Sequence, residues 1–390
     1  MAKKMCIGVN NKAQKGKKMY IGVSDKARKI RKMYIGVNGV ARCFYRSDYK
    51  AVVLDSNHAF WSSNVFRGGT YSAATTVGDY AVFAGGYDDT GTYTYYRGIY
   101  ACNKSLTVTT KSMDVSISSM AATTVGDYAL FGGGIAGSSY HDAIRVYDKS
   151  LTRIDFSGTL GFGATDLGAT SIGDYAVFGG GYNRAGSYRT DVTAINKNLV
   201  KYSGSLTLAI ARAYLKAVSI GNYALFPYGT NSSYSSKNIE TFDKSLTRGS
   251  VNGGNICRRD FGATANEKYA IIGGGITYAP SSDGIGTTSS ISNDVHALNT
   301  SLTKVSVDSL HSGYTTSPCQ ATTVNDLSIF IKPNSTQYAV YDLSLVRTIQ
   351  DSGKDIGTSY SAASIGDYAI FNKEGSSATA AAEIFQTIDA

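Results

Sequence analysis

The stretch ATTVGDYALFGGGIAGSSYHDAIRVYDKSLT, residues 122–152, decides the fold, because related copies of it occur along the chain after about residue 50. Each copy begins with an alanine at the start of a strand-like segment. These alanines are Ala74, Ala122, Ala169, Ala217, Ala263, Ala321 and Ala362. Self-similarity at a regular spacing is the mark of a repeat architecture. The sequence therefore predicts seven related units.

Each copy predicts four short strands. In residues 122–152, ATTV leads into the two-residue turn Gly126-Asp127, and YALF returns antiparallel to it. After a glycine run and a variable loop, AIRVYD predicts a third strand and LTRIDF a fourth. One such sheet cannot bury both of its faces, whereas seven arranged radially bury each against the next. We therefore expect an all-β, seven-bladed β-propeller over residues 47–390, with a linear β-solenoid as the alternative.

The composition also favours an all-β chain. The 390 residues include 43 glycines and 29 tyrosines, and only 17% are charged, which suits short strands and tight turns better than helices. The five cysteines are odd in number and lack CxxC or similar spacing, which argues against a disulfide framework and a zinc site. Neither a signal peptide nor an apolar span of about 18 residues is evident. We expect synthesis in a cytoplasm.

Residues 1–46 differ from the rest of the chain in their net charge and in the motif that they repeat. They hold 13 Lys and Arg against one acid, a net +12, whereas the other 25 basic and 28 acidic residues give the remainder a net −3. A 14-residue motif begins at Met5, Met19 and Met33, and each copy reads as a strand, a two-residue turn and a basic strand. We expect a small up-and-down β-ribbon. Because such a ribbon has too little core to stand alone, it predicts an attachment arm that docks on a partner, on another copy of itself in a homo-oligomer, or on a larger assembly.

The positive charge of this arm has two interpretations. Outward lysines on edge strands prevent sheet-to-sheet aggregation, and a basic run can instead bind a phosphate backbone. Aromatic residues do not alternate with the charges as they do in proteins that bind single strands. Nucleic acid is therefore the less favoured partner.

The two ends of the repeat region are expected to meet. The seventh unit reaches only Gln386 before the last few residues, which leaves no room for its fourth strand. The segment KAVVLD at residues 50–55 precedes the first unit and has the pattern of the missing strand. Pairing the two ends in one sheet would remove two exposed edges.

Two resemblances extend this interpretation. The strand ending in GGG, the variable loop and the V-x-x-Y-D strand resemble kelch repeats over roughly residues 50–390, which implies a β-propeller. The tryptophan usual after the third strand of that family is replaced by Leu106, Leu151, Leu199, Leu246, Leu302 and Leu345. The YIGV-NG-VAR repeats of the arm are similar to leading segments of structural proteins, such as tail proteins, of bacteriophages and prophages of Gram-positive bacteria. This second resemblance implies a virion protein.

The repeated acidic residues are interpreted as turn formers. One set directly follows glycine in a hairpin turn: Asp79, Asp127, Asp174 and Asp367, with Asn222 in their place in one unit. A second set precedes the next turn: Asp148, Asp243 and Asp342, alternating with Asn103, Asn196 and Asn299. The four histidines occur singly, and neither a GxSxG elbow nor a P-loop is present. We expect no metal, no cofactor and no enzymatic activity.

The loops after the glycine runs vary while the strands around them stay nearly constant. Tyrosine, serine, glycine and asparagine dominate these loops, a mixture that suits adaptable recognition surfaces. Equivalent loops emerge on one face of a propeller, so we expect a shared binding rim. Its tyrosines are Tyr93, Tyr95, Tyr96, Tyr140, Tyr188, Tyr234 and Tyr278. Ordinary soluble loops are the alternative interpretation.

Together these patterns predict a non-enzymatic bacteriophage virion protein. Residues 1–46 would dock into the particle, and the propeller loops would recognise a glycan or protein on the host surface. A glycan is the favoured class, because tyrosine faces stack on the apolar side of sugar rings. A decoration or scaffold protein without receptor binding and, less favoured, a carbohydrate-active enzyme are the alternatives.

Overall fold

The computed structural model describes residues 6–9, 12–15, 19–23, 26–30, 32–37, 40–46, 49–54, 69–88, 94–233, 237–254, 257–280, 287–310, 318–331, 333, 335–353, 358–373 and 382–389. The chain divides into two compact units, one of Met1–Ala51 with Thr387–Ala390 and the other of Val52–Gln386.

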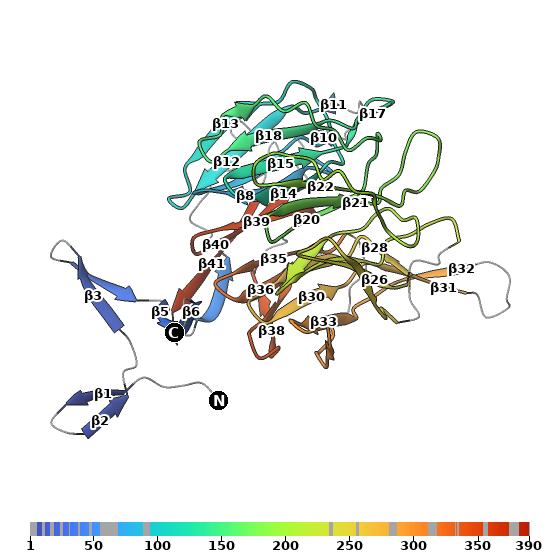
Figure 1. The fold of residues 1–390 in the computed structure, drawn as a ribbon. Helices are drawn as coiled ribbons and strands as arrows, with labels where there is room; N and C mark the ends of the chain where they lie inside the picture. Colours follow the sequence, from blue (N-terminus) through green and yellow to red (C-terminus); the bar gives the residue numbers. More distant parts are fainter. Residues whose placement is uncertain are drawn as a thin grey trace. The chain divides into compact units, whose positions relative to one another are not determined.

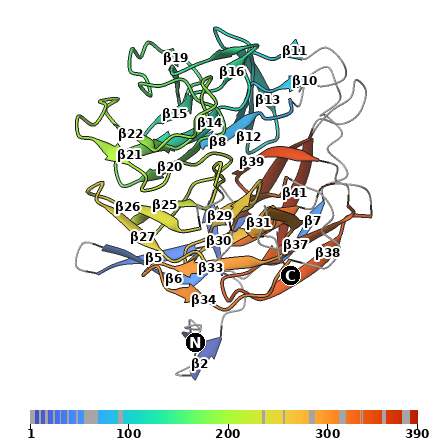
Figure 2. The ribbon, with the colours of Figure 1, turned by 90° about the vertical axis from the view of Figure 1, so that its right-hand side faces the viewer.

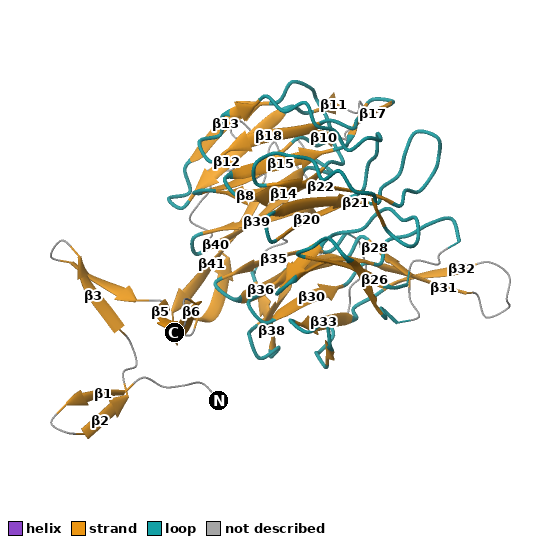
Figure 3. Ribbon diagram, viewed as in Figure 1, coloured by secondary structure: helices purple, strands orange, loops and turns teal. Residues whose placement is uncertain are grey.

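All regular elements in these residues are β-strands, as Figure 3 shows, so the chain is all-β as expected. The strands are short because turn-forming residues interrupt each apolar segment after about five residues. The described residues contain no helix with the length and apolar character needed to cross a membrane.

Within the described ranges, seven antiparallel sheets have four strands each. The first two are β13-β12-β9-β8 (Val108–Ser112, Gly98–Asn103, Tyr80–Ala84, Ala73–Val77) and β14-β15-β18-β19 (Ala121–Val125, Tyr128–Gly132, Ile144–Asp148, Arg153–Ile154). The next two are β20-β21-β22-β23 (Gly168–Ile172, Tyr175–Gly179, Asp191–Asn196, Leu206–Thr207) and β24-β25-β26-β27 (Val218–Ile220, Tyr223–Pro227, Ile239–Asp243, Arg248–Val251). The last three are β29-β30-β33-β34 (Gly262–Ala265, Tyr269–Gly273, Val295–Asn299, Lys304–Val305), β35-β36-β37-β38 (Gln320–Val324, Leu327–Ile331, Gln337–Tyr341, Arg347–Asp351) and β39-β40-β41-β7 (Ser359–Ile365, Tyr368–Lys373, Ala382–Asp389, Tyr49–Leu54).

The register of each first hairpin follows from its turn. In the second sheet the pairing of β14 with β15 ends at Val125 and Tyr128, which leaves Gly126 and Asp127 as the turn. Gly126 has a φ of 56°, a left-handed conformation that glycine adopts without steric cost. The predicted strand–turn–strand is therefore confirmed.

The first strands of the seven sheets follow one another in a closed sequence of contacts. The contacts run from β8 through β14, β20, β24, β29 and β35 to β39, and β39 contacts β8. Part of this sequence, β39, β8, β14 and β20, can be followed in Figures 1 and 2. The four-stranded antiparallel sheets are consistent with the expected β-propeller.

Second strands hold neighbouring sheets together. In β15 every residue after Tyr128 is buried. Leu130 packs in one apolar cluster with Phe178 and Ile195 of the third sheet. Phe131, which points to the opposite face, packs with Val82 of the first sheet. Each large apolar side chain buried in this way stabilises the fold by about 1.5–3 kcal/mol.

The last sheet packs against the first in the same manner. Phe83 of β9 lies in one cluster with Ile370 of β40 and Ile384 of β41. In the order β39-β40-β41-β7, the strand β7 occupies the fourth place. This strand, Tyr49–Leu54, overlaps residues 50–55, the segment that the sequence predicted would complete the seventh unit.

Each repeat of the arm forms a hairpin of its own. The hairpins are β1–β2 (Cys6–Val9, Lys12–Lys15), β3–β4 (Met19–Val23, Lys26–Ile30) and β5–β6 (Lys32–Val37, Val40–Arg46). Among these described strands, no pairing joins one hairpin to the next, and each repeat forms the predicted strand, turn and basic strand. The pairing of Val23 with Lys26 leaves a two-residue connection, which favours pairing inside one repeat.

The variable loops contain strand pairs that the sequence did not predict. These are β10–β11 (Tyr87–Asp88, Thr94–Tyr95), β16–β17 (Ile135–Ala136, Ser139–Tyr140) and the three-stranded β28-β31-β32 (Cys257–Arg259, Ile276–Pro280, Thr287–Ile291). Backbone pairing therefore fixes several loop tyrosines in place.

The repeated acidic residues serve the turns, as expected. The Oδ1 atom of Asp148 accepts hydrogen bonds from the backbone N–H groups of Ser150 and Thr152, both at 2.8 Å. Asn103 and Asn196 accept the same pair of bonds in their own sheets. The leucines that recur after this turn have φ between 59° and 62°: Leu106, Leu151, Leu199, Leu246, Leu302 and Leu345.

The other set of aspartates forms surface ion pairs at the same end of the sheets. Asp79 pairs with Lys104 at 2.5 Å, Asp127 with Lys149 at 3.0 Å and Asp174 with Lys197 at 3.0 Å. Exposed pairs of this kind contribute little to stability.

Asp148→Ala should lower the free energy of unfolding by about 1–2 kcal/mol, because two backbone N–H groups lose their acceptor. Asp148→Asn should leave it nearly unchanged, since asparagine accepts the same two bonds at positions 103 and 196. Urea denaturation of the two variants measures the difference. Equal destabilisation by Ala and Asn would contradict this role.

Candidate functional site

A cavity of about 260 Å³ lies where the first strands of the seven sheets meet. Its walls include the alanine that begins each copy of the repeat: Ala74, Ala122, Ala169, Ala217, Ala263, Ala321 and Ala362. We call it the axial cavity. Small side chains at this position leave space along the line on which the strands converge.

One residue at or just before each first strand also lines the axial cavity. These mouth residues are Tyr71, Ser119, Asp166, Tyr214, Asp260, Pro318 and Tyr360. Side-chain chemistry therefore varies at the mouth while the alanines next to it stay constant. A constant scaffold with a variable polar edge is typical of a binding site.

The backbone of the mouth is held by hydrogen bonds between successive sheets. The N–H of Ser119 donates to the carbonyl of Tyr71 at 2.8 Å, and the N–H of Tyr214 donates to the carbonyl of Asp166 at 2.9 Å. Five mouth residues share a φ of 55–56°, namely Tyr71, Ser119, Asp166, Tyr214 and Asp260. Non-glycine residues seldom adopt this left-handed conformation, and such strain is commonly found at functional sites.

The variable loops flank the same end of the axial cavity. In an antiparallel hairpin the start of the first strand lies beside the end of the second, where the loop begins. Isolated bridges pair Thr70 with Tyr87 and Thr165 with Tyr182. The residue before each of these two mouth positions is thereby joined to the residue that opens its loop.

Tyrosine rings form two groups at this end. On one side Tyr71 stacks on Tyr87 with ring centres 5.9 Å apart, and Tyr360 lies 4.9 Å from Tyr71. Tyr95 adds a ring 5.7 Å from Tyr87. On the other side Tyr182 and Tyr188 meet edge to face at 5.2 Å.

Four of the seven predicted rim tyrosines contact, or lie near, residues at this end of the axial cavity. Tyr95 and Tyr188 contact the rings just described, and Tyr278 lies against Arg259. Burial raises the pKa of Tyr140, and smaller contributions come from Tyr182, Asp166 and Tyr95, which places Tyr140 within electrostatic reach of both tyrosine groups.

Of the other three predicted tyrosines, Tyr96 lies in the described residues. The Tyr96 hydroxyl donates to the Asp88 carboxylate at 3.3 Å, within its own loop. Tyr93 and Tyr234 lie outside the described residues.

Sequence reasoning missed the mouth residues themselves. Tyr71, Asp166, Tyr214 and Asp260 stand just before the repeated alanines, where the units were treated as scaffold. The change from tyrosine to serine or aspartate at one position of the repeat was the signal that could have found them.

Arg259, the last residue of β28, links the three-stranded sheet β28-β31-β32 to the tyrosines. Its guanidinium lies over the ring of Tyr214 at 5.5 Å and over that of Tyr278 at 5.6 Å, and its Nε lies 3.4 Å from the Asp260 carboxylate. Cation–π contacts of this kind contribute about 0.5–2 kcal/mol each. They hold a positive charge next to two acidic mouth residues.

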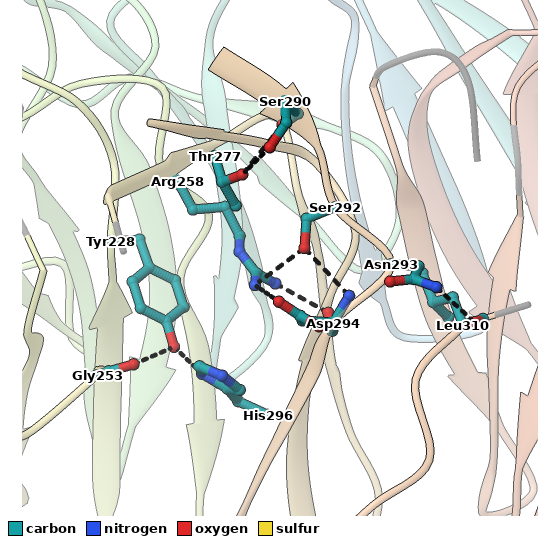
Figure 4. Close-up of polar contacts among 10 residues, drawn as sticks. All are labelled: Tyr228, Gly253, Arg258, Thr277, Ser290, Ser292, Asn293, Asp294, His296 and Leu310. Carbon is teal, nitrogen blue, oxygen red and sulfur yellow. Dashed lines mark hydrogen bonds and ion pairs between the residues drawn. The ribbon is translucent and has the colours of Figure 1, made fainter. Parts of the chain in front are cut away.

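The preceding residue, Arg258, anchors this segment from inside the protein, as Figure 4 shows. It is fully buried, lies over the Tyr228 ring at 5.5 Å, and donates to the Asp294 carbonyl at 2.9 Å. The Tyr228 hydroxyl donates to the Gly253 carbonyl at 3.1 Å and contacts Nδ1 of His296. Burial, followed by the charge of Arg258, lowers the pKa of His296 to about 4, so this ring is neutral at pH 7.

The charged groups in the axial cavity are perturbed by burial. Burial raises the pKa of Asp166 to about 6, and the charge of Asp260 adds to this effect, while the Thr165 hydroxyl donates to Asp166 at 2.8 Å and opposes it. Burial lowers the pKa of Lys216 to about 8. The Lys216 ammonium donates to the Gln320 side-chain carbonyl at 2.6 Å, so it links the fourth sheet to the sixth.

The donor set of the axial cavity suits an organic ligand. Phenol hydroxyls, two carboxylates, an ammonium and a guanidinium can donate and accept hydrogen bonds, and the rings offer flat faces for stacking. In the described part of the chain no group of three or more His, Cys, Asp or Glu side chains is placed to hold a metal ion.

Comparison with known proteins supports the fold alone. No family model matches the sequence, and no curated protein matches it. A solved structure titled "Structure of YjhT" resembles the chain with a TM-score of 0.56 and 12% sequence identity, covering 73% of this chain and 98% of that one. At this identity the likeness concerns the arrangement of the strands and not the ligand.

Asp166→Asn should stabilise the protein at neutral pH. An unfolded carboxyl loses its proton near pH 4, whereas the folded Asp166 keeps it up to about pH 6. The wild type therefore loses stability as pH rises from 4 to 6, and the loss is complete above 6. The asparagine variant should be more stable by about 1–3 kcal/mol at pH 7.5 and equal at pH 4.

Urea denaturation of both proteins at the two pH values measures this difference. Asparagine tolerates the left-handed backbone at position 166, so the substitution adds no strain of its own. A variant less stable than the wild type at pH 7.5 would show that the Asp166 carboxylate stabilises the fold instead.

Proposed function

We propose that this chain is a non-enzymatic bacteriophage virion protein whose seven sheets are the blades of a β-propeller with a ligand site at one end of its axis. The observation that carries the proposal is the tyrosine-rich mouth of the axial cavity, where variable side chains stand on a constant scaffold. Residues 1–46 attach the protein to the particle, and the propeller binds the host surface.

A cell-surface glycan is the ligand that this mouth fits best. Tyr71 is 39% exposed, so its ring is open to a ligand from solution. Phenol faces stack on the apolar face of a sugar, and their hydroxyls bond to sugar hydroxyls. The fixed pairing of β10 with β11 and of β16 with β17 lowers the entropy lost when these loops bind.

The place in a virion rests on the arm. Its hairpins carry the net charge of +12 on a chain whose remainder is slightly acidic, so the two parts meet different surroundings. Two-stranded hairpins are marginally stable alone, which favours docking on a larger assembly. The YIGV-NG-VAR repeats resemble segments of phage structural proteins, so we infer that this assembly is a phage particle.

Replacing the four rim tyrosines Tyr95, Tyr140, Tyr188 and Tyr278 by serine together should reduce binding to host cells at least tenfold, because the stacking faces are lost. Flow cytometry with the labelled full-length protein measures this. Tyr202→Ser is the control, since Tyr202 is 38% exposed, stands outside the variable loops and contacts Tyr175 in the second strand of the third sheet.

Three outcomes would contradict the proposal. If the wild type binds no host cells and does not compete with phage adsorption, the protein only decorates or bridges the particle. If purified protein turns over host glycans, it is an enzyme. Retained binding by the fourfold variant would move the site away from the loops.

A further inference from the structure

The charges of the axial cavity are unequally compensated. Asp260 has the Arg259 guanidinium at 3.4 Å, and Lys216 has the Gln320 side chain at 2.6 Å. Asp166 accepts a hydrogen bond from the neutral Thr165 hydroxyl at 2.8 Å, and no cation of the described residues lies within ion-pair distance of it. Asp166 is therefore the acidic group of the mouth with the weakest counter-charge inside the protein.

Two tyrosines line the axial cavity together with this carboxylate. They are Tyr71 and Tyr214, and the backbone N–H of Tyr214 donates to the Asp166 carbonyl at 2.9 Å. Burial is the main cause of the raised pKa of Tyr214, and the Asp166 charge adds to it; for Tyr71 burial comes first, followed by the charges of Asp260 and Asp166. Both phenols therefore share one cavity and its electrostatic surroundings with the Asp166 carboxylate.

A carboxylate among aromatic rings is the arrangement that binds organic cations. Ring faces attract an ammonium group through their quadrupoles, and the carboxylate forms a charge-assisted hydrogen bond with it. The nearby guanidinium of Arg259 is already occupied by Asp260 and by the rings of Tyr214 and Tyr278. A neutral sugar would leave the half-buried Asp166 charge without a cation at ion-pair distance, which is costly.

We propose that the mouth of the axial cavity binds a saccharide with a free amino group, whose ammonium lies against the Asp166 carboxylate and beside the rings of Tyr71 and Tyr214. This inference rests on the proposed function and names the glycan class of the same site. The sugar ring stacks on the tyrosines, and its ammonium supplies a cation at ion-pair distance from Asp166, where the Arg259 guanidinium acts only from farther away.

Calorimetric titration of the full-length protein at pH 7 tests this with glucosamine, N-acetylglucosamine and glucose as probes. Glucosamine should bind about tenfold or more tightly than the other two, as expected for one charge-assisted hydrogen bond. Asp166→Asn should abolish that preference. Asp174→Asn should keep it, because Asp174 is an exposed turn residue paired with Lys197 in the same sheet.

Tyr214→Phe provides a second variant with the ring kept, and Tyr214→Asn one with the ring removed in a residue that tolerates the left-handed backbone. The first should retain the glucosamine preference and the second should weaken it. Thermal unfolding of each variant shows whether it is folded.

Each outcome has one meaning. Equal affinity of the wild type for the three sugars, or an undiminished preference in folded Asp166→Asn, would overturn the inference. If the fourfold tyrosine variant loses host binding but no amine preference exists, the proposed function stands and this inference fails. If the amine preference exists but host cells are not bound, the inference stands and the proposed host-binding function fails.

Discussion

The packing of each second strand between two neighbouring sheets is the constraint on which the rest of the structure depends. Leu130 and Phe131 point to opposite faces of β15, and each meets apolar residues of a different sheet. No sheet could bury both faces alone, so each needs a neighbour on both sides. The first and last sheets satisfy this need with each other, through Phe83 and Ile370.

This packing limits where the sequence can vary. The strand YALF and the turns at Gly126 and Asp148 recur because every copy makes the same contacts. The first strands converge, so their alanines must stay small and leave a cavity between them. Residues just before those alanines face this cavity, and their repeated contacts are made by the backbone and not by the side chains. Chemical variety therefore collects at the mouth.

The fold was readable from the repeat, because spacing and turn chemistry report local structure that each copy repeats. The strands, the turn role of Asp148 and the completing strand near residue 50 all followed from pattern. The site was readable only in part. Loop tyrosines such as Tyr95 were visible as variation, but Asp166 and Tyr214 come together from different sheets, and no local pattern records that meeting.

A crystal structure of the protein soaked with fragments of the host cell-surface glycan tests the central claim most directly, namely that the tyrosine-rich end of the axial cavity is the ligand site. The account predicts sugar density between Tyr71 and Tyr214, in contact with Asp166. Sugar density at the outer strands or at the turns that contain Asp127 and Asp148, with the mouth free of ligand, would contradict it.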